Sequence, residues 1–322
     1  MRILITAPYN EQGQATLAKQ FGEVVYTPWK ENARAFNEAE LIALIDTHQA
    51  DAIIIEHDHV TAKVIETHPQ LRFIGVCRGT PSNVALAAAK EKGIPVFHTP
   101  ARNAQAVAEL FLATVIDLLR NTQAGTEWLK RRAWTDDAHT SYLQFKGNEL
   151  AGKTIGMVGF GAVGQRIAKM VEHFPCEIIF YDPYLKDYPS SYRSTTMEDV
   201  FSTADIVSIH LPVNESTIGL IDGKLIALMK PQAIFVNTAR ASVVKRDDLL
   251  AALEQGKIRG AVLDVFDHEP PDETDYRLID LPNVIATPHI AGATHEVEDH
   301  HVTILNNQLK AWADDKNIQL DL

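Results

Sequence analysis

The chain has little of what marks a secreted, membrane-spanning or nucleic-acid-binding protein. Its 322 residues include two cysteines, Cys77 and Cys176, and neither lies in a metal or redox spacing. No apolar run approaches the roughly 20 residues of a bilayer span, and Met1–Thr6 is too short an apolar run for a signal peptide. Acidic residues outnumber basic ones, 42 to 30, for a formal net charge of −12. We therefore expect a protein of the reducing cytoplasm that binds neither nucleic acid nor membrane.

The length predicts two domains, and the first 98 residues have the pattern of a small α/β sheet. Short apolar runs alternate with amphipathic stretches, which indicates parallel strands joined by crossover helices. The predicted strands are Ile3–Thr6, Glu23–Tyr26, Ala52–Ile55, Phe73–Val76 and Pro95–Phe97, and the predicted helices are Glu11–Gln20, Glu38–Thr47, Thr61–Glu66 and Asn83–Glu91. Ligands of such doubly wound domains bind outside the carboxyl ends of the strands.

Residues 154–182 contain the most specific motif of the chain. The apolar run Thr154–Val158 leads into Gly159-Phe160-Gly161-Ala162-Val163-Gly164, a helical pattern follows, and a second apolar run ends in Asp182. In a strand–turn–helix of this kind the glycines permit a tight turn, a close approach to a pyrophosphate and close helix packing. The helix N-terminus favours phosphate. The alternative, a glycine-rich surface turn, does not explain the two strands, the helix and the acid together.

Asp182 follows Gly164 by 18 residues (182 − 164), close to the usual offset of about 20. Its carboxylate can accept hydrogen bonds from both hydroxyls of an adenosine ribose and would repel a 2′-phosphate. The motif therefore predicts NAD in preference to NADP.

The alternation continues to the end of the chain and predicts a second, larger parallel sheet. Its six predicted strands are Thr154–Val158, Glu177–Tyr181, Ile206–Ile209, Ala233–Val236, Gly260–Leu263 and Val284–Ala286, with helices at Met197–Ser202 and Arg246–Gln255 among others. A long helical stretch, Asn103–Arg132, is expected to bridge domains or subunits, with Gly125 as a candidate break and Trp128 and Trp134 as packing aromatics. The tail, Gly292–Asp314, is a last amphipathic helix that can return to the first domain.

Polar residues follow several strands of the second sheet. Arg240 follows Ala233–Val236, Asp264 and Glu269 follow Gly260–Leu263, and His289 follows Val284–Ala286. The carboxyl ends of parallel strands share one edge, so these side chains can share one pocket. An arginine fork binds carboxylate, a histidine titrates near neutral pH, and a carboxylate fixes the histidine tautomer. Each residue alone can equally be an ordinary loop or salt-bridged residue, but together they predict reduction of a 2-keto acid.

These residues give the chain a resemblance to a known family. GFGAVG with Asp182, HLPVNEST (210–217), VNTARASVV (236–244), LDVFDHEP (263–270) and TPHIAGAT (287–294) resemble the D-isomer-specific 2-hydroxyacid dehydrogenases, which include phosphoglycerate dehydrogenase-like members. The segment GIPVFHTPARNAQAVAE (93–109) also resembles the family's entry into the cofactor domain. The resemblance covers almost the whole chain.

The resemblance implies a fold, an activity and site residues. The fold is α/β, with two doubly wound parallel-sheet domains: a Rossmann NAD-binding domain, 100–289, inserted in a discontinuous flavodoxin-like substrate domain, 1–99 and 290–322. The activity is NAD-dependent interconversion of a small D-2-hydroxy acid and its 2-keto acid, and the assembly is a homodimer. The implied catalytic residues are His289 as acid/base, Glu269 as its partner and Arg240 as substrate anchor. The implied cofactor-binding residues are Gly159, Gly161, Ala162, Val163, Gly164, Asp182, Pro212, Thr238, Ala239, Arg240, Asp264, His289 and Gly292, with Asp264 accepting from the carboxamide.

Some segments depart from the family. The turn after Phe73–Val76 reads CRGTPSN and is most similar to phosphoglycerate-dehydrogenase-like members. The family's use of this turn predicts substrate binding by the backbone near Gly79, and Arg78 is a candidate contact to a second anionic group, although it can equally be a solvated loop residue. Lys245 stands where an acid is common. We expect no C-terminal regulatory domain and hence no feedback control by serine.

Two other functions remain as alternatives. One is an NAD(H)-sensing interaction protein of the same fold, similar to a corepressor of this family. The other is a metal protein, from the ligand-rich runs 56–59 and 295–301. Neither run has the spacing of a closed metal site, so we predict no metal.

Overall fold

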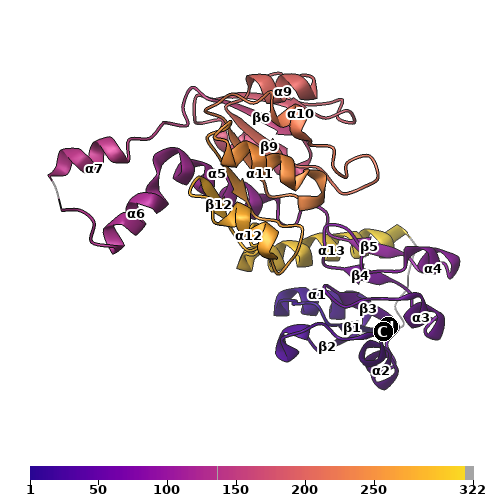
Figure 1. Ribbon diagram of the computed structural model, residues 1–322. Coiled ribbons are helices and arrows are strands. Elements are labelled where there is room, and N and C mark those ends of the chain that lie inside the picture. The colour runs from indigo at the N-terminus through magenta and orange to yellow at the C-terminus, as the bar shows by residue number, and fades with distance from the viewer. Residues whose placement is uncertain (136, 316–322) are drawn as a thin grey trace. The chain divides into compact units, whose positions relative to one another are not determined.

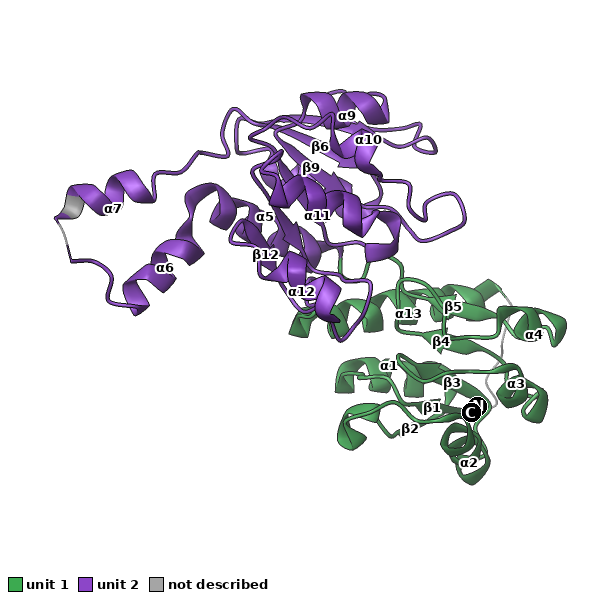
Figure 2. Cartoon of the chain, in the orientation of Figure 1, with its two compact units in different colours: residues 1–103, 293–322 green, residues 104–292 purple. Residues whose placement is uncertain are grey.

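The computed structural model describes residues 1–135 and 137–315 of the chain. It divides into two compact units: unit 1 comprises Met1–Asn103 and the chain from Ala293 onward, and unit 2 comprises Ala104–Gly292 (Figure 2). The predicted boundaries, after residues 99 and 289, lie four and three residues earlier (103 − 99 and 292 − 289). The use of unit 1 for substrate stays a prediction.

Unit 1 is built on a five-stranded parallel sheet in the order β2-β1-β3-β4-β5 (Figure 1). Its strands are β1 (Arg2–Ile5), β2 (Glu23–Tyr26), β3 (Ala52–Ile55), β4 (Ile74–Val76) and β5 (Val96–His98). Its helices are α1 (Glu11–Phe21), α2 (Glu38–His48), α3 (Ala62–Thr67), α4 (Leu86–Glu91) and α13 (His295–Asp315), with a 3₁₀ turn, η1 (Trp29–Asn32). This strand order is the flavodoxin-like form of the doubly wound fold, so the predicted architecture of the first domain is confirmed.

Helices cover both faces of this sheet because its strands are apolar on both sides. Ile3 and Ile5 of β1 pack with α1 and α13, whereas Leu4 between them packs with α2 on the opposite face. Successive side chains of a strand point to opposite faces. Helix α13 therefore belongs to the core of unit 1, although it is far from β1 in the sequence.

Unit 2 contains a seven-stranded parallel sheet in the order β12-β11-β10-β9-β6-β7-β8. The strands are β6 (Thr154–Val158), β7 (Glu177–Tyr181), β8 (Arg193–Ser194), β9 (Ile206–Ile209), β10 (Ile234–Asn237), β11 (Gly260–Leu263) and β12 (Val284–Ala286). The first six in chain order follow the dinucleotide-binding order 3-2-1-4-5-6, and β12 extends that sheet by one strand. The expectation of six strands was wrong because β8 is two exposed residues at the sheet edge, without an apolar run.

Two layers of helices cover the sheet of unit 2. Phe111 of α5 and Ile167 of α8 pack on one face with Met157 and Val236, and helices α9 to α12 pack on the other with Val207 and Phe235. The helices are α5 (Ala104–Arg120), α6 (Thr122–Lys130), α7 (Ala138–Gln144), α8 (Ala162–Val171), α9 (Met197–Thr203), α10 (Gly223–Ile226), α11 (Arg246–Glu254) and α12 (Glu273–Ile279), with a 3₁₀ turn, η2 (Ala241–Val243). In sheets of this kind, ligands bind outside the carboxyl ends of the strands.

The long stretch from residue 103 is two helices. Helix α5 ends at Arg120, Asn121 adopts a left-handed conformation with φ +56°, and α6 begins at Thr122. The predicted break at Gly125 was wrong, because Gly125 lies inside α6 and Asn121 tolerates the left-handed conformation at the junction. Trp128 packs against Trp134, with ring centroids 5.8 Å apart, which confirms the predicted role of these aromatics. Among the described residues, no helix combines the length and apolar character needed to cross a membrane.

Candidate active site

Three adjacent strands of the unit 2 sheet carry the predicted catalytic side chains. The order β12-β11-β10 places the loops that begin after Ala286, Leu263 and Asn237 next to one another at the carboxyl edge. His289, Glu269 and Arg240 lie on these three loops. The predicted common edge is therefore confirmed.

His289 and Glu269 form a direct pair. Nδ1 of His289 lies 2.7 Å from Oε2 of Glu269, and both side chains are about two-fifths exposed, at 44% and 42%. His289 has a left-handed backbone, with φ +54°, and its N–H donates to the Thr287 carbonyl at 2.9 Å. Such a conformation is unusual for a residue with a Cβ and occurs often at functional sites. Because Nδ1 faces the carboxylate, Nε2 is the nitrogen left for a reacting group.

The buried carboxylate of Asp264 holds the loop that carries His289. Its Oδ1 accepts from the Thr287 hydroxyl at 2.5 Å and the Ile290 N–H at 2.8 Å, and its Oδ2 accepts from the Ala291 N–H at 2.8 Å. Asp264 is completely buried, so these charge-assisted bonds replace its hydration. Contact between Asp264 and a nicotinamide carboxamide stays a prediction.

The loop that carries Arg240 is held by hydrogen bonds to its backbone, while the Arg240 side chain is exposed. The Asn237 amide donates to the Arg240 carbonyl at 2.9 Å and accepts from the Ala239 N–H at 3.0 Å. The Arg240 side chain is exposed, and one guanidinium nitrogen donates to the Ala239 carbonyl at 2.6 Å. Within the described part of the chain, Arg240 bonds neither Glu269 nor His289. Sequence reasoning missed Asn237, which the rule of polar residues at strand ends would have found.

The glycine turn after β6 fits a dinucleotide. Gly159 has φ +87°, and a Cβ there would lie 2.6 Å from the His210 carbonyl oxygen. Gly161 begins α8 without a side-chain cap, and a Cβ on it would meet nothing within 4 Å. A Cβ on Gly164 would lie 3.0 Å from the Gly159 carbonyl oxygen. The turn therefore leaves open space and uncapped helix N–H groups beside Ala162 and Val163, where a pyrophosphate can bind.

Two side-chain observations also bear on the cofactor site. The Thr238 hydroxyl is buried without a hydrogen-bond partner among the described residues, which suits a bound polar group. Pro212 follows β9 on the same edge and is exposed, while Gly292 ends unit 2 and Ala239 is partly buried. Contact of these residues with the cofactor stays a prediction.

Asp182 follows β7 and is tied to the glycine turn. Its Oδ2 accepts from the Phe160 N–H at 2.8 Å, and its Oδ1 accepts from the N–H groups of Tyr184 and Leu185 at 3.0 and 3.2 Å. The Phe160 ring stacks on Phe180 of β7 with centroids 4.1 Å apart. A carboxylate has about four acceptor positions, so ribose hydroxyls would use the remaining lone pair or replace the two weaker bonds.

His210 follows β9, the strand that lies between β6, which leads into the glycine turn, and β10, which leads into the Arg240 loop. Burial lowers the pKa of its imidazole to about 4, so the ring is neutral at pH 7. Its Nε2 lies 2.9 Å from the Ser208 hydroxyl. Sequence reasoning did not select this histidine, because its burial against the glycine turn depends on the pairing of β6 with β9.

Arg78 and Gly79 follow β4 in unit 1. The Arg78 carbonyl accepts from the Thr99 N–H, and the Gly79 carbonyl accepts from Nδ1 of His98, each at 2.9 Å. A Cβ on Gly79 would meet nothing within 4 Å. The turn is thus fixed through its carbonyl groups, and its role in substrate binding stays a prediction.

The ligand-rich runs have partners within unit 1. Glu56 accepts from the Trp29 indole at 3.2 Å and pairs with Arg102 at 3.2 Å, and Asp58 accepts from the Thr6 hydroxyl at 2.6 Å. Among the described residues, the group with ligand atoms close enough for an ion is His268, Asp272 and Asp275, in neither run. Asp275 in that group pairs with Arg246, so the arrangement is explained without a metal.

Comparison with known proteins places the chain in a family. A family model described as "D-isomer specific 2-hydroxyacid dehydrogenase, NAD binding domain" matches residues 112–291, more than half of the chain. YoaD of Bacillus subtilis strain 168, assigned to the 2-hydroxyacid dehydrogenases, is 57% identical over 320 residues, 99% of this chain and 93% of YoaD. D-3-phosphoglycerate dehydrogenase of Methanocaldococcus jannaschii is 36% identical over 96% of this chain, which spans 57% of that enzyme's length.

Solved structures share the fold over almost the whole chain. A D-2-hydroxyisocaproate dehydrogenase superposes with a TM-score of 0.83 at 26% identity, over 99% of this chain and 98% of that one. An acyclic imino acid reductase in complex with NADPH and D-Arg superposes with a TM-score of 0.82 at 25% identity, over the whole of both chains. The matched family model is that of an NAD-binding domain, so the cofactor of the present chain is NAD; contact of Asp182 with the ribose stays a prediction. The chain belongs to the D-isomer-specific 2-hydroxyacid dehydrogenase family of NAD-dependent oxidoreductases.

Proposed function

We propose that the chain interconverts a small D-2-hydroxy acid and its 2-keto acid, with His289 as the acid/base, Glu269 as its partner and Arg240 as the substrate anchor. The observation that carries the proposal is the 2.7 Å contact between His289 Nδ1 and Glu269 Oε2. These two residues lie on the loops after β12 and β11, and β11 is also the neighbour of β10, whose loop bears Arg240. Fold alone does not imply function, and this pair supplies the chemistry that the fold needs.

In reduction, His289 donates the proton on Nε2 to the carbonyl oxygen of the keto acid, and in oxidation it takes that proton from the hydroxyl. The Glu269 carboxylate fixes the tautomer and stabilises the imidazolium that oxidation produces. The planar Arg240 fork binds the substrate carboxylate and polarises the neighbouring carbonyl. NAD, when bound, exchanges the hydride with C2 of the acid.

We also propose that the turn at Arg78 and Gly79 binds an anionic group of the substrate. Two observations support this proposal: there is open space beside Gly79, and hydrogen bonds to its carbonyl groups fix the turn. In such a turn the backbone N–H groups can donate to an anion, and Arg78 adds a positive charge. A substrate with a second anionic group, such as a phosphorylated keto acid, would make the most use of Arg78.

The direct test is NADH oxidation with a panel of keto acids: glyoxylate, hydroxypyruvate, pyruvate, branched 2-keto acids and phosphohydroxypyruvate, each repeated with NADPH. We expect turnover with NADH on at least one acid, and loss of about 10²–10⁴-fold in kcat for His289→Gln with the KM for NADH unchanged. His173→Gln, at an exposed histidine of the same unit, is the matched control. NADH binding without turnover on any acid would contradict the proposal and favour the NAD(H)-sensing alternative.

We further propose a cytoplasmic homodimer joined through the α6–α7 segment of unit 2. Figure 2 shows α6 and α7 extending from α5 beyond the sheet, and four large apolar side chains there are exposed: Leu129, Trp134, Tyr142 and Leu143. A groove of about 560 Å³ beside them is lined by residues of α6, Phe145 and Ile279–Ile285. An exposed apolar cluster next to a groove favours contact with a second copy.

The oligomeric state tests this assembly. Sedimentation of the wild type should give a dimer, and Leu143→Asp, at a side chain 71% exposed, should shift the mass toward the monomer. Leu228→Asp, at an exposed leucine after α10, should leave the dimer intact. A wild-type monomer at micromolar concentration would refute the proposed interface.

A further inference from the structure

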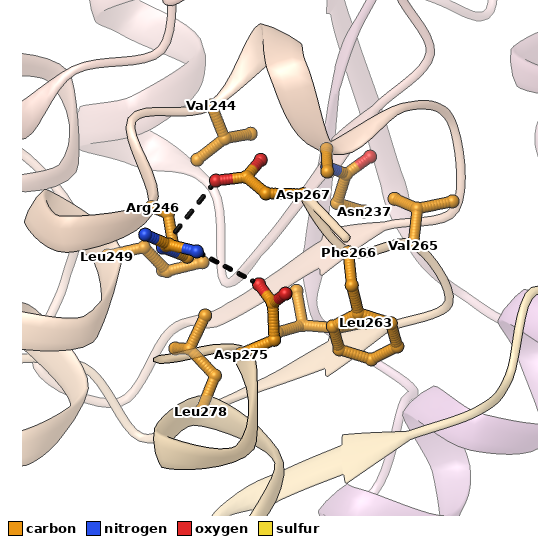
Figure 3. A pocket seen from close by; sticks show the side chains of 11 residues that line it. Asn237, Val244, Arg246, Leu249, Leu263, Val265, Phe266, Asp267, Asp275 and Leu278 are labelled. Atoms are coloured by element: carbon orange, nitrogen blue, oxygen red, sulfur yellow. Dashed lines mark hydrogen bonds and ion pairs between the residues drawn. The ribbon is translucent and has the colours of Figure 1, made fainter. Parts of the chain in front are cut away.

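A partly buried ion-pair cluster, with the fully buried Asp275 at its centre, lies beside the loop that carries Glu269. Arg246, the first residue of α11, extends toward this loop, and its Nη1 lies 3.2 Å from Oδ1 of Asp275 on α12. Its Nε lies 3.5 Å from Oδ2 of Asp267. Figure 3 shows Arg246 pointing between these two carboxylates, with the aromatic ring of Phe266 beyond them. The cluster is therefore built from three segments: α11, the loop after β11 and α12.

Asp275 is the centre of this cluster. It is completely buried, and its Oδ2 accepts from the N–H groups of His268 at 3.1 Å and of Asp272 at 3.3 Å. The same oxygen lies 3.2 Å from Nδ1 of His268. One carboxylate therefore holds the backbone on both sides of Glu269, which lies between His268 and Asp272.

The cluster reaches Arg240 as well. A cavity of about 20 Å³ is lined by Arg246, Asp267 and Asp275 together with Asn237, whose amide holds the Arg240 carbonyl. That volume admits about one water molecule, so the cavity is too small for substrate. Its lining residues hold the neighbouring loops by hydrogen bonds: Asp275 holds the backbone at His268 and Asp272, and Asn237 holds the Arg240 carbonyl.

Glu269 depends on such support. Its side chain is 42% exposed, and apart from His289 its contact is a 3.3 Å bond from the Phe266 N–H. An exposed glutamate on a loop has many rotamers, whereas catalysis needs the carboxylate at the imidazole. Ion pairs that are partly exposed add little net stability, so the contribution that we consider for this cluster is to the geometry of the loop.

Among the described residues, the charged groups that face Arg246 are Asp247 of α11, Asp267 and Asp272 of the loop, and Asp275 of α12. His268 faces Asp275 from the same loop. Burial acts to raise the pKa of Asp275, but hydrogen bonds from the Asp272 N–H, Arg246 and His268 outweigh it and hold the pKa below its usual value. Asp275 thus stays ionised through the working pH range, and the cluster persists there.

We infer that Arg246 and Asp275 are positioning residues of the proposed reaction: together they lock residues 264–272 so that the Glu269 carboxylate meets His289. The inference rests on the proposed function of the His289–Glu269 pair. It adds to that function two residues, from α11 and α12, that touch neither substrate nor cofactor.

The test uses Arg246→Met and Asp275→Asn, with kcat, KM and the pH profile of keto-acid reduction as readouts. We expect kcat to fall about 10- to 100-fold, as for a displaced catalytic group, with the KM for NADH unchanged. A carboxylate beside an imidazole favours its protonated form, so the high-pH limb of the profile should move to lower pH, as in Glu269→Gln. Arg246→Lys, which keeps the charge but not the planar fork, should restore part of the rate.

Arg277→Met is the matched control, because Arg277 lies on α12, the helix of Asp275, and pairs at the surface with Glu254 of α11, the helix of Arg246. It should change neither rate nor pH profile. In a Glu269→Gln background, Arg246→Met should move the pH limb no further, because both changes act on one contact. A lower melting temperature with the wild-type rate and pH profile would overturn the inference. A Glu269→Gln enzyme with wild-type turnover would instead overturn the proposed function.

Discussion

The two halves of the unit 2 sheet differ in how they present the groups proposed to bind ligands. On the β6–β7 side, these groups are glycines and backbone N–H groups, and they lie between Gly159 and Asp182, which are 23 positions apart (182 − 159). On the β10–β12 side, they are the side chains of Arg240, Glu269 and His289, from loops after three strands, with Arg240 and His289 49 positions apart (289 − 240). The β6–β7 side depends on glycines, whose lack of a side chain leaves space for a ligand. The β10–β12 side depends on side chains whose loops are held in place by other residues, as Asp264 holds the His289 loop. Substitutions that add or remove atoms should therefore act differently on the two halves.

The largest expected effect comes from removing a support on the β10–β12 side. Asp264→Ala leaves the Thr287 hydroxyl and the N–H groups of Ile290 and Ala291 without their acceptor. We expect the free energy of unfolding to fall by about 3 kcal/mol and kcat to fall about 100-fold, because His289 lies on the released loop. Urea unfolding and steady-state turnover measure the two losses.

The control for this prediction is Glu198→Ala, which removes an exposed carboxylate from α9 and should change both quantities little. Wild-type kcat in Asp264→Ala, whatever its stability, would mean that the His289 loop holds its conformation without the buried carboxylate.

The converse experiment adds atoms on the β6–β7 side. In Gly161→Val the first added carbon meets nothing within 4 Å, so folding should be unchanged, but the side chain fills the space proposed for the pyrophosphate. We expect the KM for NADH to rise about 100-fold, equivalent to about 2.7 kcal/mol of lost binding, with the melting temperature retained. Gly159→Ala should lose stability as well, because its φ of +87° and the 2.6 Å approach to His210 exclude a Cβ.

The same contrast explains what the sequence could predict. The glycine turn and Asp182 lie in one contiguous segment, so their spacing reports their geometry directly. The common location of Arg240, Glu269 and His289 was predicted from strand ends, because a parallel sheet aligns those ends whatever the loop lengths. Their individual roles were predicted from the family resemblance. Both arguments use local patterns and the general rule of the fold.

The residues that were missed act through contacts that a local pattern does not encode. Arg246 and Asp275 meet across 29 residues, and both resemble ordinary charges of surface helices in the sequence. The two-residue strand β8 has no apolar run, and the helix break at Asn121 depends on one left-handed residue. These features depend on tertiary packing, which local sequence patterns do not report.

His210, on the strand between the two halves, allows a pH test of their junction. Its pKa is about 4 in the folded chain because of burial, against about 6.5 when unfolded. The unfolded state therefore binds more protons between these values, and stability falls as the pH decreases from about 6.5 to 4. At pH 5 the loss relative to pH 7 should reach about 2 kcal/mol.

Urea unfolding of wild type and His210→Gln at pH 7 and pH 5 isolates this term, because other titrating groups cancel in the difference. The free energy of unfolding of the wild type should fall relative to that of His210→Gln between pH 7 and pH 5, because only the wild type has the imidazole. Parallel changes in both would mean that the His210 imidazole is hydrated in the folded chain.

The smallest expected effect concerns the choice of cofactor, and it tests whether the β6–β7 side also uses a side chain. Asp182→Ser removes the charge that repels a 2′-phosphate, and the ratio of kcat/KM for NADPH to that for NADH should rise about 10-fold, or about 1.4 kcal/mol. Because Asp182 also accepts three backbone N–H groups, the variant should melt at a lower temperature. Asp187→Ser, at an exposed acid nearby, should change neither. Equal losses with both cofactors would mean that Asp182 serves only to hold the glycine turn, and the β6–β7 side would then recognise its ligand through backbone alone.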